Sequence, residues 1–316
     1  GVVLGKKGFA NDAVKSFEKA IDLMIKKLTI NPNDSNTLNN LGIAFFETER
    51  FEESMTSYQK ALDIQPNLAD VWNNLGTVFQ KLNQYEDAIK SFEKAYSIKP
   101  EIDYILGNIL GAKMNSCNWN GLSEILDEAQ KRIVNNEKVI DSFTLTGLID
   151  DPTLQRKTAE LFTQYHYPKK KSLTLIDRHP KHPKIRIGYF SADFHNHATM
   201  HLMAELFELH KKSLFEIIAF SFGPDKKDEW RQRAVNSFDK FIDVRHKSDL
   251  EVSMIAREME IDIAVDLAGL TAKSKTDVFA MSAAPIQLSY IGYLGTMGVN
   301  YYDYLIADQI MIPKKY

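Results

Sequence analysis

Three histidines lie within a short stretch of the second half of the chain. His195, His197 and His201 follow an apolar run, and Asp193 is the nearest carboxylate. Imidazoles are good zinc ligands, so one interpretation is a metal site, in which a turn and a helix start bring all three rings together. Another is a neutral histidine at a helix N-terminus, where the helix dipole disfavours the charged ring and leaves it able to accept or relay a proton. A purely structural role for any of the three also fits the sequence.

A second candidate segment lies at residues 265–271. Its Gly269 permits a tight turn, and Thr271 could donate a hydrogen bond to a sugar or phosphate oxygen. Asp266, in the same segment, could act in the chemistry or cap the loop. We therefore take Gly269 and Thr271 as candidate substrate contacts.

A third segment, residues 292–298, is rich in glycine. Gly292, Gly295 and Gly298 could let backbone N–H groups approach an anionic ligand. The segment follows Ala-Pro-Ile-Gln at 284–287. It does not have the strand-to-helix GxGxxG form with an acidic residue about 20 positions further on, so it does not predict a dinucleotide site.

All three segments are expected at the ends of strands. Apolar runs predict strands at 185–191, 215–222, 241–244, 261–267 and 304–306, and helical periodicity predicts helices at 199–210, 227–236 and 250–259. Apolar strands separated by helices indicate a parallel sheet covered on both faces, which is a Rossmann-like α/β lobe. Such sheets bind ligands at the carboxyl ends of their strands, so we expect the chemistry after Ser191, after Leu267 and around Gly292.

The first half of the chain is a repeat array. The sequence Asn-Asn-Leu-Gly at 39–42 recurs at 73–76, an offset of 34 residues. The same offset links Phe51 to Tyr85, Ser54 to Ala88, Tyr58 to Phe92, Ala61 to Ala95 and Pro66 to Pro100. This pattern resembles the tetratricopeptide repeat (TPR), in which small residues let two antiparallel helices approach, aromatic residues fill the space between helix pairs, and a proline ends the second helix. The sequence therefore predicts an α-solenoid.

The repeats and the later strands divide the chain into three parts. Full repeats occupy 35–66 and 69–100, after a partial copy in 1–32 whose second helix carries an insertion of seven residues, or about two turns. Degenerate or capping helices and a basic, proline-punctuated linker occupy 101–180, and the α/β lobe occupies 184–316. Residue 1 falls inside a repeat, so we expect the chain to begin within a helix.

Composition excludes several kinds of partner. There are 39 Lys and Arg against 42 Asp and Glu, a net charge of −3, so there is no bulk positive field for nucleic acid or an anionic membrane. Cys117 is the only cysteine, which rules out an intrachain disulfide framework or a cysteine metal cluster. No signal peptide or apolar run of about 18–20 residues is present. We expect a cytoplasmic protein without nucleic-acid or membrane partners.

Two asparagines suggest what the repeats bind. Asn40 and Asn74 each precede a Leu-Gly pair on the first helix of a repeat, where a side chain can face the concave groove. Stacked amides there could hydrogen-bond the backbone of an extended peptide whatever its sequence. The alternative is that these helical positions serve packing alone.

Taken in order behind the repeats, these motifs are similar to those of the O-GlcNAc transferase family, glycosyltransferase family 41, and of the related Spindly-type fucosyltransferases. The resemblance rests on Gly-Tyr-Phe-Ser-Ala-Asp-Phe at 188–194 with His197 and His201, the turn at 266–271, Ala-Pro-Ile-Gln at 284–287, and Gly-Tyr-Leu-Gly-Thr-Met-Gly at 292–298. It covers nearly the whole chain.

The resemblance implies a two-lobed GT-B enzyme, of which residues 184–316 form the first lobe. It implies transfer of N-acetylglucosamine from UDP to Ser or Thr hydroxyls of acceptor proteins in the TPR groove, with no metal and no cofactor beyond the nucleotide-sugar donor. On matching positions, His197 takes the place of the active-site histidine, and Thr199, Met200 and His201 follow it on the first helix. Gly292, Tyr293, Gly295 and Thr296 correspond to a segment near the sugar, and Asn40 and Asn74 to an asparagine ladder that binds the acceptor.

Some positions depart from the family pattern. Leu270 stands where His or Tyr is common, Ser282 and Ala283 replace Arg-Pro, and Leu294 replaces Pro. The second lobe, which carries most nucleotide contacts in this family, is not in the sequence, so we expect the chain to be a fragment truncated at both ends and inactive by itself. Two other functions stay open: O-fucosyl transfer of the Spindly type, and a non-catalytic adaptor that binds peptides through its repeats.

Overall fold

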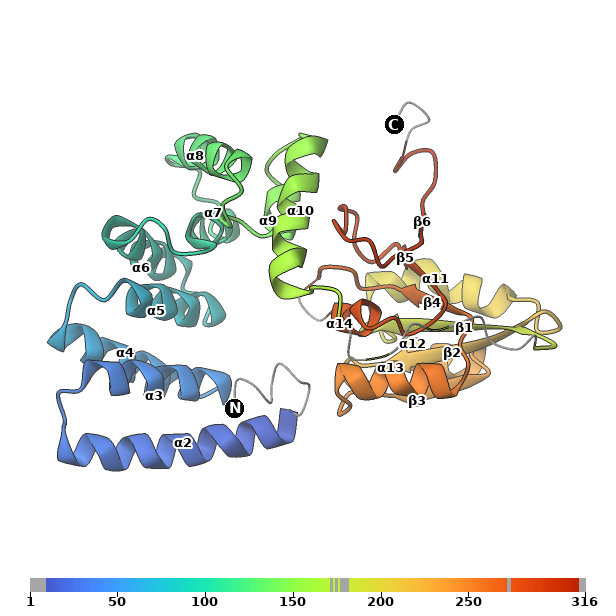
Figure 1. The fold of residues 1–316 in the computed structure, drawn as a ribbon, viewed down its shortest axis with the longest axis horizontal. Coiled ribbons are helices and arrows are strands. Elements are labelled where there is room, and N and C mark those ends of the chain that lie inside the picture. Colours follow the sequence, from blue (N-terminus) through green and yellow to red (C-terminus); the bar gives the residue numbers. More distant parts are fainter. Residues whose placement is uncertain (1–9, 171–172, 174–175, 177–181, 272–273, 313–316) are drawn as a thin grey trace. The chain divides into compact units, whose positions relative to one another are not determined.

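The computed structural model describes residues 10–170, 173, 176, 182–271 and 274–312 (Figure 1). The chain forms two compact units, which divide between Leu161 and Phe162. Among the described residues, no helix is both long enough and apolar enough to cross a membrane. The first nine residues of the predicted partial repeat, and most of the predicted linker before residue 182, lie outside the described residues.

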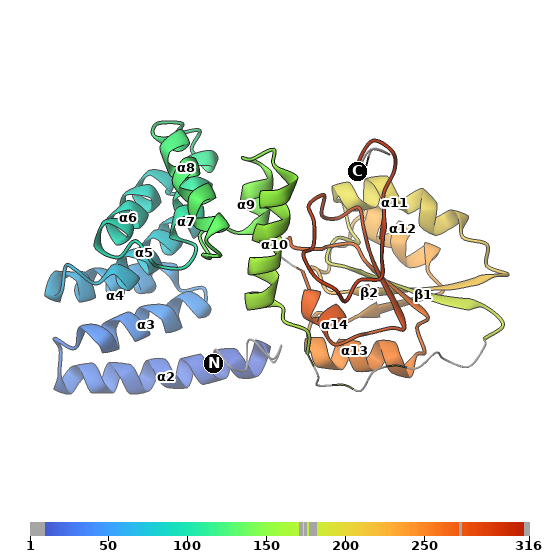
Figure 2. The ribbon, with the colours of Figure 1, turned by 45° about the horizontal axis from the view of Figure 1, so that its top comes forward.

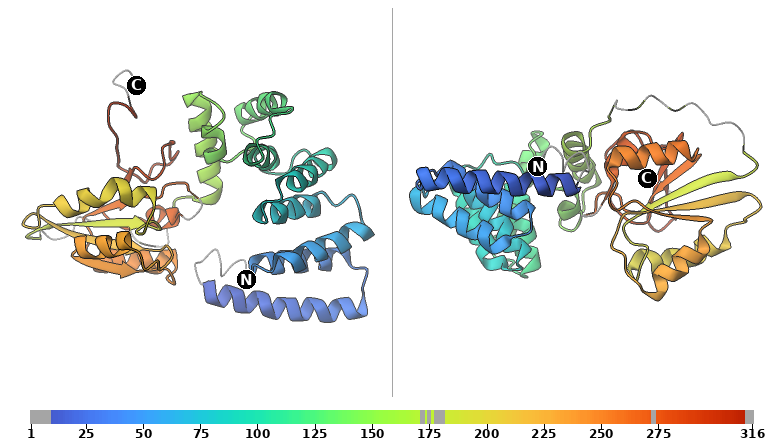
Figure 3. Two further views of the ribbon diagram at one scale, coloured as in Figure 1. Left: turned by 180° about the vertical axis from the view of Figure 1, so that it is seen from behind. Right: turned by 90° about the horizontal axis from the view of Figure 1, so that it is seen from below.

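The first unit consists of helices packed in antiparallel pairs (Figure 3). The helices are α2 (Ala10–Ile30), α3 (Ser35–Glu47), α4 (Phe51–Ile64), α5 (Ala69–Lys81), α6 (Tyr85–Ile98), α7 (Ile105–Asn115), α8 (Leu122–Val134), α9 (Ser142–Thr146) and α10 (Pro152–His166), the last of which crosses the division between the units. The two predicted full repeats are α3–α4 and α5–α6. Helix α2 has 21 residues where α4 and α6 each have 14, so the predicted seven-residue insertion lengthens that helix.

Small residues let the helices of each pair approach, as the repeat pattern predicts. A Cβ placed on Gly42 would lie 2.5 Å from the ring of Tyr58, and one on Gly76 would lie 2.6 Å from the ring of Phe92. Both rings are at most 2% exposed. Glycine is therefore required at both positions because the partner ring fills the space that a side chain would need.

The second unit is built on a parallel sheet of six strands. The strands are β1 (Ile185–Ser191), β2 (Phe215–Ser221), β3 (Lys240–Asp243), β4 (Ile263–Asp266), β5 (Ile286–Tyr290) and β6 (Tyr304–Ile306), in the order β3-β2-β1-β4-β5-β6. The order reverses at β1 and β4, which pair directly, with Phe190 beside Asp266. In such sheets ligands bind outside the carboxyl ends of the strands at this switch point.

Helices cover both faces of the sheet, as predicted (Figure 2). Helices α11 (Ala198–Leu209) and α12 (Glu229–Ser237) pack on one face, and α13 (Asp249–Glu258) and α14 (Thr276–Ala280) pack on the other. The chain after β1 therefore passes to one face and the chain after β4 to the other. The carboxyl ends of β1 and β4 form the edge where the two paths separate.

Strand β5 and helix α14 were not predicted. No strand was predicted at Ala-Pro-Ile-Gln, residues 284–287, but Gln287 lies inside β5 and is 3% exposed. Its amide donates to the backbone oxygens of Phe279 and Tyr301 and accepts the N–H of Ala283. A polar residue can occupy this buried strand because all its hydrogen-bonding groups have partners.

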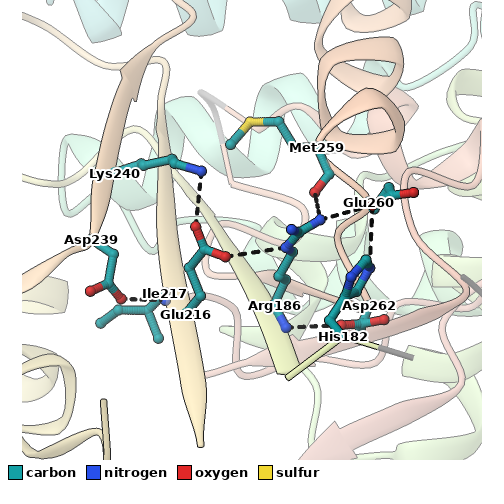
Figure 4. A network of polar contacts seen from close by, with 9 residues as sticks. All are labelled: His182, Arg186, Glu216, Ile217, Asp239, Lys240, Met259, Glu260 and Asp262. Carbon is teal, nitrogen blue, oxygen red and sulfur yellow. Dashed lines mark hydrogen bonds and ion pairs between the residues drawn. The ribbon is translucent and has the colours of Figure 1, made fainter. Parts of the chain in front are cut away.

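A polar network holds the amino ends of the strands, away from the carboxyl edge (Figure 4). The Arg186 guanidinium on β1 donates to Glu216 on β2 at 3.1 Å and to Glu260 at 3.0 Å, just before β4. Lys240 on β3 pairs with the other oxygen of Glu216 at 2.9 Å. The network joins the amino ends of three neighbouring strands, β3, β2 and β1.

The second unit also starts earlier in the chain than the predicted boundary at 184. Thr163 donates to the backbone oxygen of Gly298 at 3.1 Å, and the Tyr301 hydroxyl donates to the backbone oxygen of Tyr167 at 3.2 Å. Lys170 forms an ion pair with Asp277 of α14. The described residues from Phe162 to Lys170 therefore pack with the lobe instead of linking to it.

Candidate functional site

The histidine turn, residues 192–197, follows β1 at the switch point and ends in the N-cap of α11. His197 is that N-cap: its Nδ1 accepts the backbone N–H of Thr199 at 3.2 Å. A nitrogen that accepts a hydrogen bond carries no proton, so we assign the imidazole hydrogen to Nε2. The His197 side chain is 45% exposed. This assignment leaves the only N–H group of the ring at Nε2, on a side chain that is nearly half exposed.

The nearest acid to His197 is Asp193, in the same turn. The Asp193 Oδ2 atom lies 3.7 Å from Nδ1 of His197, and the Asp193 backbone N–H donates to the Ser191 hydroxyl at 2.9 Å. Asp193 is therefore tied to the end of β1 while its carboxylate lies near the His197 ring.

His195 and His201 do not join His197 in a metal centre. The Nε2 atom of His201 lies 2.8 Å from the Asn196 side-chain oxygen, and its ring centre lies 4.0 Å from that of Trp230. His195 is half-buried, with its ring centre 5.8 Å from that of His197. Among the residues that the structure describes, no three His, Cys, Asp or Glu side chains are placed to hold a metal ion.

The other residues predicted on the first turn of α11, Thr199, Met200 and His201, differ in how far they are exposed to solvent. His201 is exposed next to the turn, and Thr199 is 8% exposed with its hydroxyl 3.2 Å from Nδ1 of His197. Met200 is 1% exposed and packs in the core beneath α11. The prediction that Met200 contacts substrate does not hold for its side chain, because that helical position faces the sheet.

The Asp266 turn, residues 266–271, follows β4 beside the histidine turn. One oxygen of Asp266 accepts the backbone N–H groups of Ala268 at 2.8 Å and Gly269 at 3.0 Å, and the other accepts the Tyr302 hydroxyl at 2.5 Å. Asp266 is 2% exposed, and burial raises its pKa above the ordinary range. Of the two interpretations of Asp266, the structure supports loop capping.

Gly269 and Thr271 also serve the shape of this turn. Gly269 has a φ of +58°, and a Cβ there would lie 2.3 Å from Cβ of Tyr293. The Thr271 hydroxyl donates to the backbone oxygen of Ala268 at 2.9 Å. Gly269 is buried and Thr271 half-buried, so Thr271 is the member of this pair that a ligand could reach.

The glycine loop, residues 292–298, leaves β5 and packs against the Asp266 turn. A Cβ on Gly292 would lie 1.8 Å from the backbone oxygen of Leu267, so only glycine fits there. Tyr293 is 5% exposed and packs with Leu270 and Met297, and a Cβ on Gly295 would lie 2.5 Å from its hydroxyl oxygen. The predicted segments after β4 and β5 are therefore brought together, with Tyr293 as packing between them.

A groove of about 510 Å³ opens along the other side of the glycine loop. Its walls include Tyr293, Gly295 and Thr296 from the loop and Tyr302 to Leu305 from the chain entering β6. Thr296 is exposed. Three of the residues predicted near the sugar thus line a hollow between the glycine loop and the chain that enters β6.

In the repeat unit, amides link successive repeats. Asn74 donates from its side chain to the Asn39 side-chain oxygen at 3.2 Å, and Asn108 donates to that of Asn73 at 3.0 Å. Asn40, predicted with Asn74, is exposed at the equivalent place on α3. Asn108 was missed, although it follows Asn74 by the same 34-residue period and the period alone would have found it.

Comparison with known proteins identifies the lobe. The profile of glycosyl transferase family 41 matches residues 156–316, more than half of the chain. The chain belongs to glycosyltransferase family 41. Tetratricopeptide repeat profiles match residues 42–83 and 69–102, within the helices of the first unit.

Named relatives share part of the chain. A probable UDP-N-acetylglucosamine–peptide N-acetylglucosaminyltransferase, SEC, of Arabidopsis thaliana is 38% identical over 133 residues, which is 42% of this chain and 14% of that protein. A Caenorhabditis elegans protein named for the same activity is 31% identical over 132 residues, 41% of this chain and 11% of that protein. A probable enzyme of that name, SPINDLY, from Arabidopsis thaliana is 29% identical over 137 residues, 42% of this chain and 15% of that protein.

Among solved structures, a mutant of the O-GlcNAc transferase from Thermobaculum terrenum has a similar fold. The TM-score is 0.54 at 22% sequence identity, and the match covers 98% of this chain and 54% of that one. The family 41 chain described here therefore combines a TPR solenoid with the first, Rossmann-like lobe expected of a GT-B glycosyltransferase.

Proposed function

We propose that the protein containing this chain transfers N-acetylglucosamine from UDP-GlcNAc to Ser or Thr hydroxyls of polypeptides bound by its repeats. The observation that carries the proposal is the family 41 lobe itself, in which the three predicted segments lie at the carboxyl ends of β1, β4 and β5. Because the aligned stretches cover at most 15% of the named relatives cited above, the activity is proposed for the whole protein.

In this proposal the donor lies at the switch point. The Nε2–H of His197 donates to an oxygen of the sugar nucleotide, and Thr199 and His201 belong to the same helix start. Backbone groups of Gly295 and Thr296, which line the hollow beside the glycine loop, contact the sugar, and Gly292 begins that loop. No metal or other cofactor takes part.

The acceptor polypeptide lies along the amides of Asn40, Asn74 and Asn108. The bonds from Asn74 to Asn39 and from Asn108 to Asn73 each use one N–H of the donor amide, and an amide has a second N–H and a carbonyl oxygen. Backbone recognition by neutral amides suits acceptors of varied sequence. A cytoplasmic location is part of the proposal, since the single Cys117 permits no intrachain disulfide.

The test is a sugar-transfer assay on the full-length protein, wild type against His197→Ala, with UDP-GlcNAc and GDP-fucose offered separately. We expect transfer from UDP-GlcNAc and a fall of about 100-fold or more in kcat for the variant, with an unchanged folded state. Transfer from GDP-fucose alone would replace the proposal with the Spindly-type activity. Unchanged turnover in the variant would remove His197 from the mechanism.

One observation favours a second candidate, a peptide-binding adaptor. Leu270 stands where the family commonly has a hydrogen-bonding His or Tyr, and it is 8% exposed against Tyr293 and Met297. The position thus supplies packing and no hydrogen bond to a sugar. Peptide binding by the full-length protein without transfer from either donor would establish the adaptor.

A further inference from the structure

We propose that Asp228, at the end of the loop after β2, is a positioning residue that holds the histidine turn in place for catalysis. Its catalytic consequence depends on the function proposed above. Asp228 was not among the residues predicted from the sequence, and it belongs to a different strand–helix connection from His197.

The two carboxylate oxygens of Asp228 bind two different segments. Oδ1 accepts the backbone N–H of Arg231 at 2.8 Å, which caps α12. Oδ2 accepts the backbone N–H of Asn196 at 3.0 Å, inside the histidine turn and next to His197. These bonds, that from Asn196 first, hold the pKa of Asp228 below its ordinary value, so the carboxylate is charged at neutral pH.

The start of α12 gives Asp228 a rigid base. Arg231 is 9% exposed, and its guanidinium donates to the Ser221 hydroxyl at the end of β2 at 2.6 Å. The same guanidinium lies over the ring of Phe241 on β3, 4.4 Å from the ring centre. These contacts join the first turn of α12 to strands β2 and β3. Asp228, just before that turn, then holds Asn196 relative to the same two strands.

Further contacts join the same loop to the histidine turn. Phe222 donates its backbone N–H to the Ser191 oxygen at 3.1 Å. A Cβ on Gly223 would lie 1.6 Å from the backbone oxygen of Ala192, so the two backbones touch. The loop after β2 therefore lies along the histidine turn. Asp228 is the residue of this loop that contacts Asn196, next to His197.

The side chain of Asn196 continues the connection into α11. Its oxygen lies 2.8 Å from Nε2 of His201, whose ring packs against Trp230 from the first turn of α12. Asn196 is thus held through its backbone by Asp228 and through its side chain by His201. His197 is the next residue in the chain after Asn196, so a shift of Asn196 would move the imidazole of His197.

Helix capping alone does not require an aspartate here. Ser, Asn and Asp are about equally good N-caps, and a serine would satisfy the Arg231 N–H. A serine has one short hydroxyl and cannot also reach Asn196. Asp228→Ser therefore separates the two contacts: it keeps the cap of α12 and removes the bond to the histidine turn. Asp228→Asn keeps one acceptor oxygen and is the conservative variant.

The experiment compares full-length wild type, Asp228→Ser and Asp228→Asn in the sugar-transfer assay, with Ser248→Ala as the matched control. Ser248 caps α13 in the same lobe through a capping box with Glu251 and has no part in the site. We expect kcat to fall about 10- to 100-fold in Asp228→Ser and less in Asp228→Asn, because a catalytic group displaced by about 1 Å loses rate on this scale. The KM for acceptor peptide should change less than about twofold, as should kcat of the control.

Hydrogen exchange of the segment 192–201 in the same proteins gives a second readout. We expect faster exchange in this segment in Asp228→Ser than in Ser248→Ala. This comparison tests whether Asp228 holds the histidine turn even if the wild type transfers no sugar and the proposed function fails. The proposal is overturned if folded Asp228→Ser keeps kcat within twofold of wild type, if Ser248→Ala loses as much, or if exchange in 192–201 is unchanged. Should Asp228→Ser fail to fold, the same comparisons on Asp228→Asn decide.

Discussion

Replacing Asp266 should separate the hydrogen bonds that this buried side chain accepts from the charge that it carries. Asp266→Ala removes the acceptor of three donors: the N–H groups of Ala268 and Gly269 and the hydroxyl of Tyr302. Asp266→Asn keeps an oxygen for the two N–H groups, and its NH2 group can donate to the Tyr302 oxygen. The asparagine variant should therefore keep the turn that the alanine variant loses.

The size of the difference follows from burial. A buried donor left without an acceptor costs about 1–3 kcal/mol, and Asp266 is 2% exposed. Three such donors, less the relief from no longer burying a carboxylate, give a loss of about 3–5 kcal/mol for Asp266→Ala. Tyr302→Phe removes only the third bond and keeps the ring stacked on Phe279, so it should cost about 1 kcal/mol.

Hydrogen exchange of residues 266–271 in the full-length protein measures the local stability of the turn. Protection should fall by about 100-fold or more in Asp266→Ala and by less than about tenfold in the other two variants, since about 1.4 kcal/mol corresponds to a factor of ten. Equal protection in Asp266→Ala and wild type would refute the capping role. Equal losses in the alanine and asparagine variants would show that the charge, and not the hydrogen bonds, holds the turn.

The sign of the pH dependence gives an independent check on Asp266. Its folded pKa is raised by burial, so between the ordinary carboxyl value, about 4, and the raised value the folded state keeps a proton that the unfolded state has released. This contribution to stability is complete at low pH and is lost as the pH rises through that window. Asp266→Asn has no such group and should gain stability relative to wild type as the pH rises.

Two predictions concern the repeats. Gly76→Ala should lower the free energy of unfolding by about 1–3 kcal/mol because its Cβ would meet the buried ring of Phe92 at 2.6 Å. Gly111→Ala, whose nearest neighbour would be 3.7 Å from the new Cβ, should raise the free energy of unfolding by about 0.5–1 kcal/mol. Thermal unfolding measures both changes, and a loss of stability in Gly111→Ala would contradict the packing argument. Asn108→Ala should weaken binding of an extended peptide several-fold, measured by fluorescence anisotropy, while Asn120→Ala in the exposed loop after α7 should not; equal affinities would remove Asn108 from the groove.

The fold was largely predictable because most of its helices and strands follow from the spacing of apolar residues close together in the sequence. The 34-residue period located the helix pairs, and apolar runs located five of the six strands of the described sheet. Strand β5 was missed because Pro285 and Gln287 do not read as a buried strand, and Gln287 is acceptable there only through partners distant in sequence. The family resemblance placed Met200 among the substrate contacts, whereas its side chain on the first turn of α11 packs in the core.

The site was predictable only in part, because its shape depends on contacts between segments far apart in the sequence. The sequence indicated the three segments that carry His197, Gly269 and Gly292. It held no signal for Tyr302, which binds a carboxylate 36 residues earlier, or for Asp228, which binds an amide 32 residues earlier. Patterns in a single sequence predict helices and strands well, but they do not predict which loops contact and stabilise one another in the folded chain.

Asp228 and Asp266 solve the same physical problem at this switch point. After β1 the chain passes to the face covered by α11, and after β4 to the face covered by α14, so the two turns diverge. Backbone N–H groups that lie outside a ladder need other acceptors, and a carboxylate offers two oxygens that can serve different segments. Asp266 joins its own turn to Tyr302, and Asp228 joins the histidine turn to α12. Acidic side chains thus lie beside both turns where they diverge, and under the proposed function they support the site without being part of its chemistry.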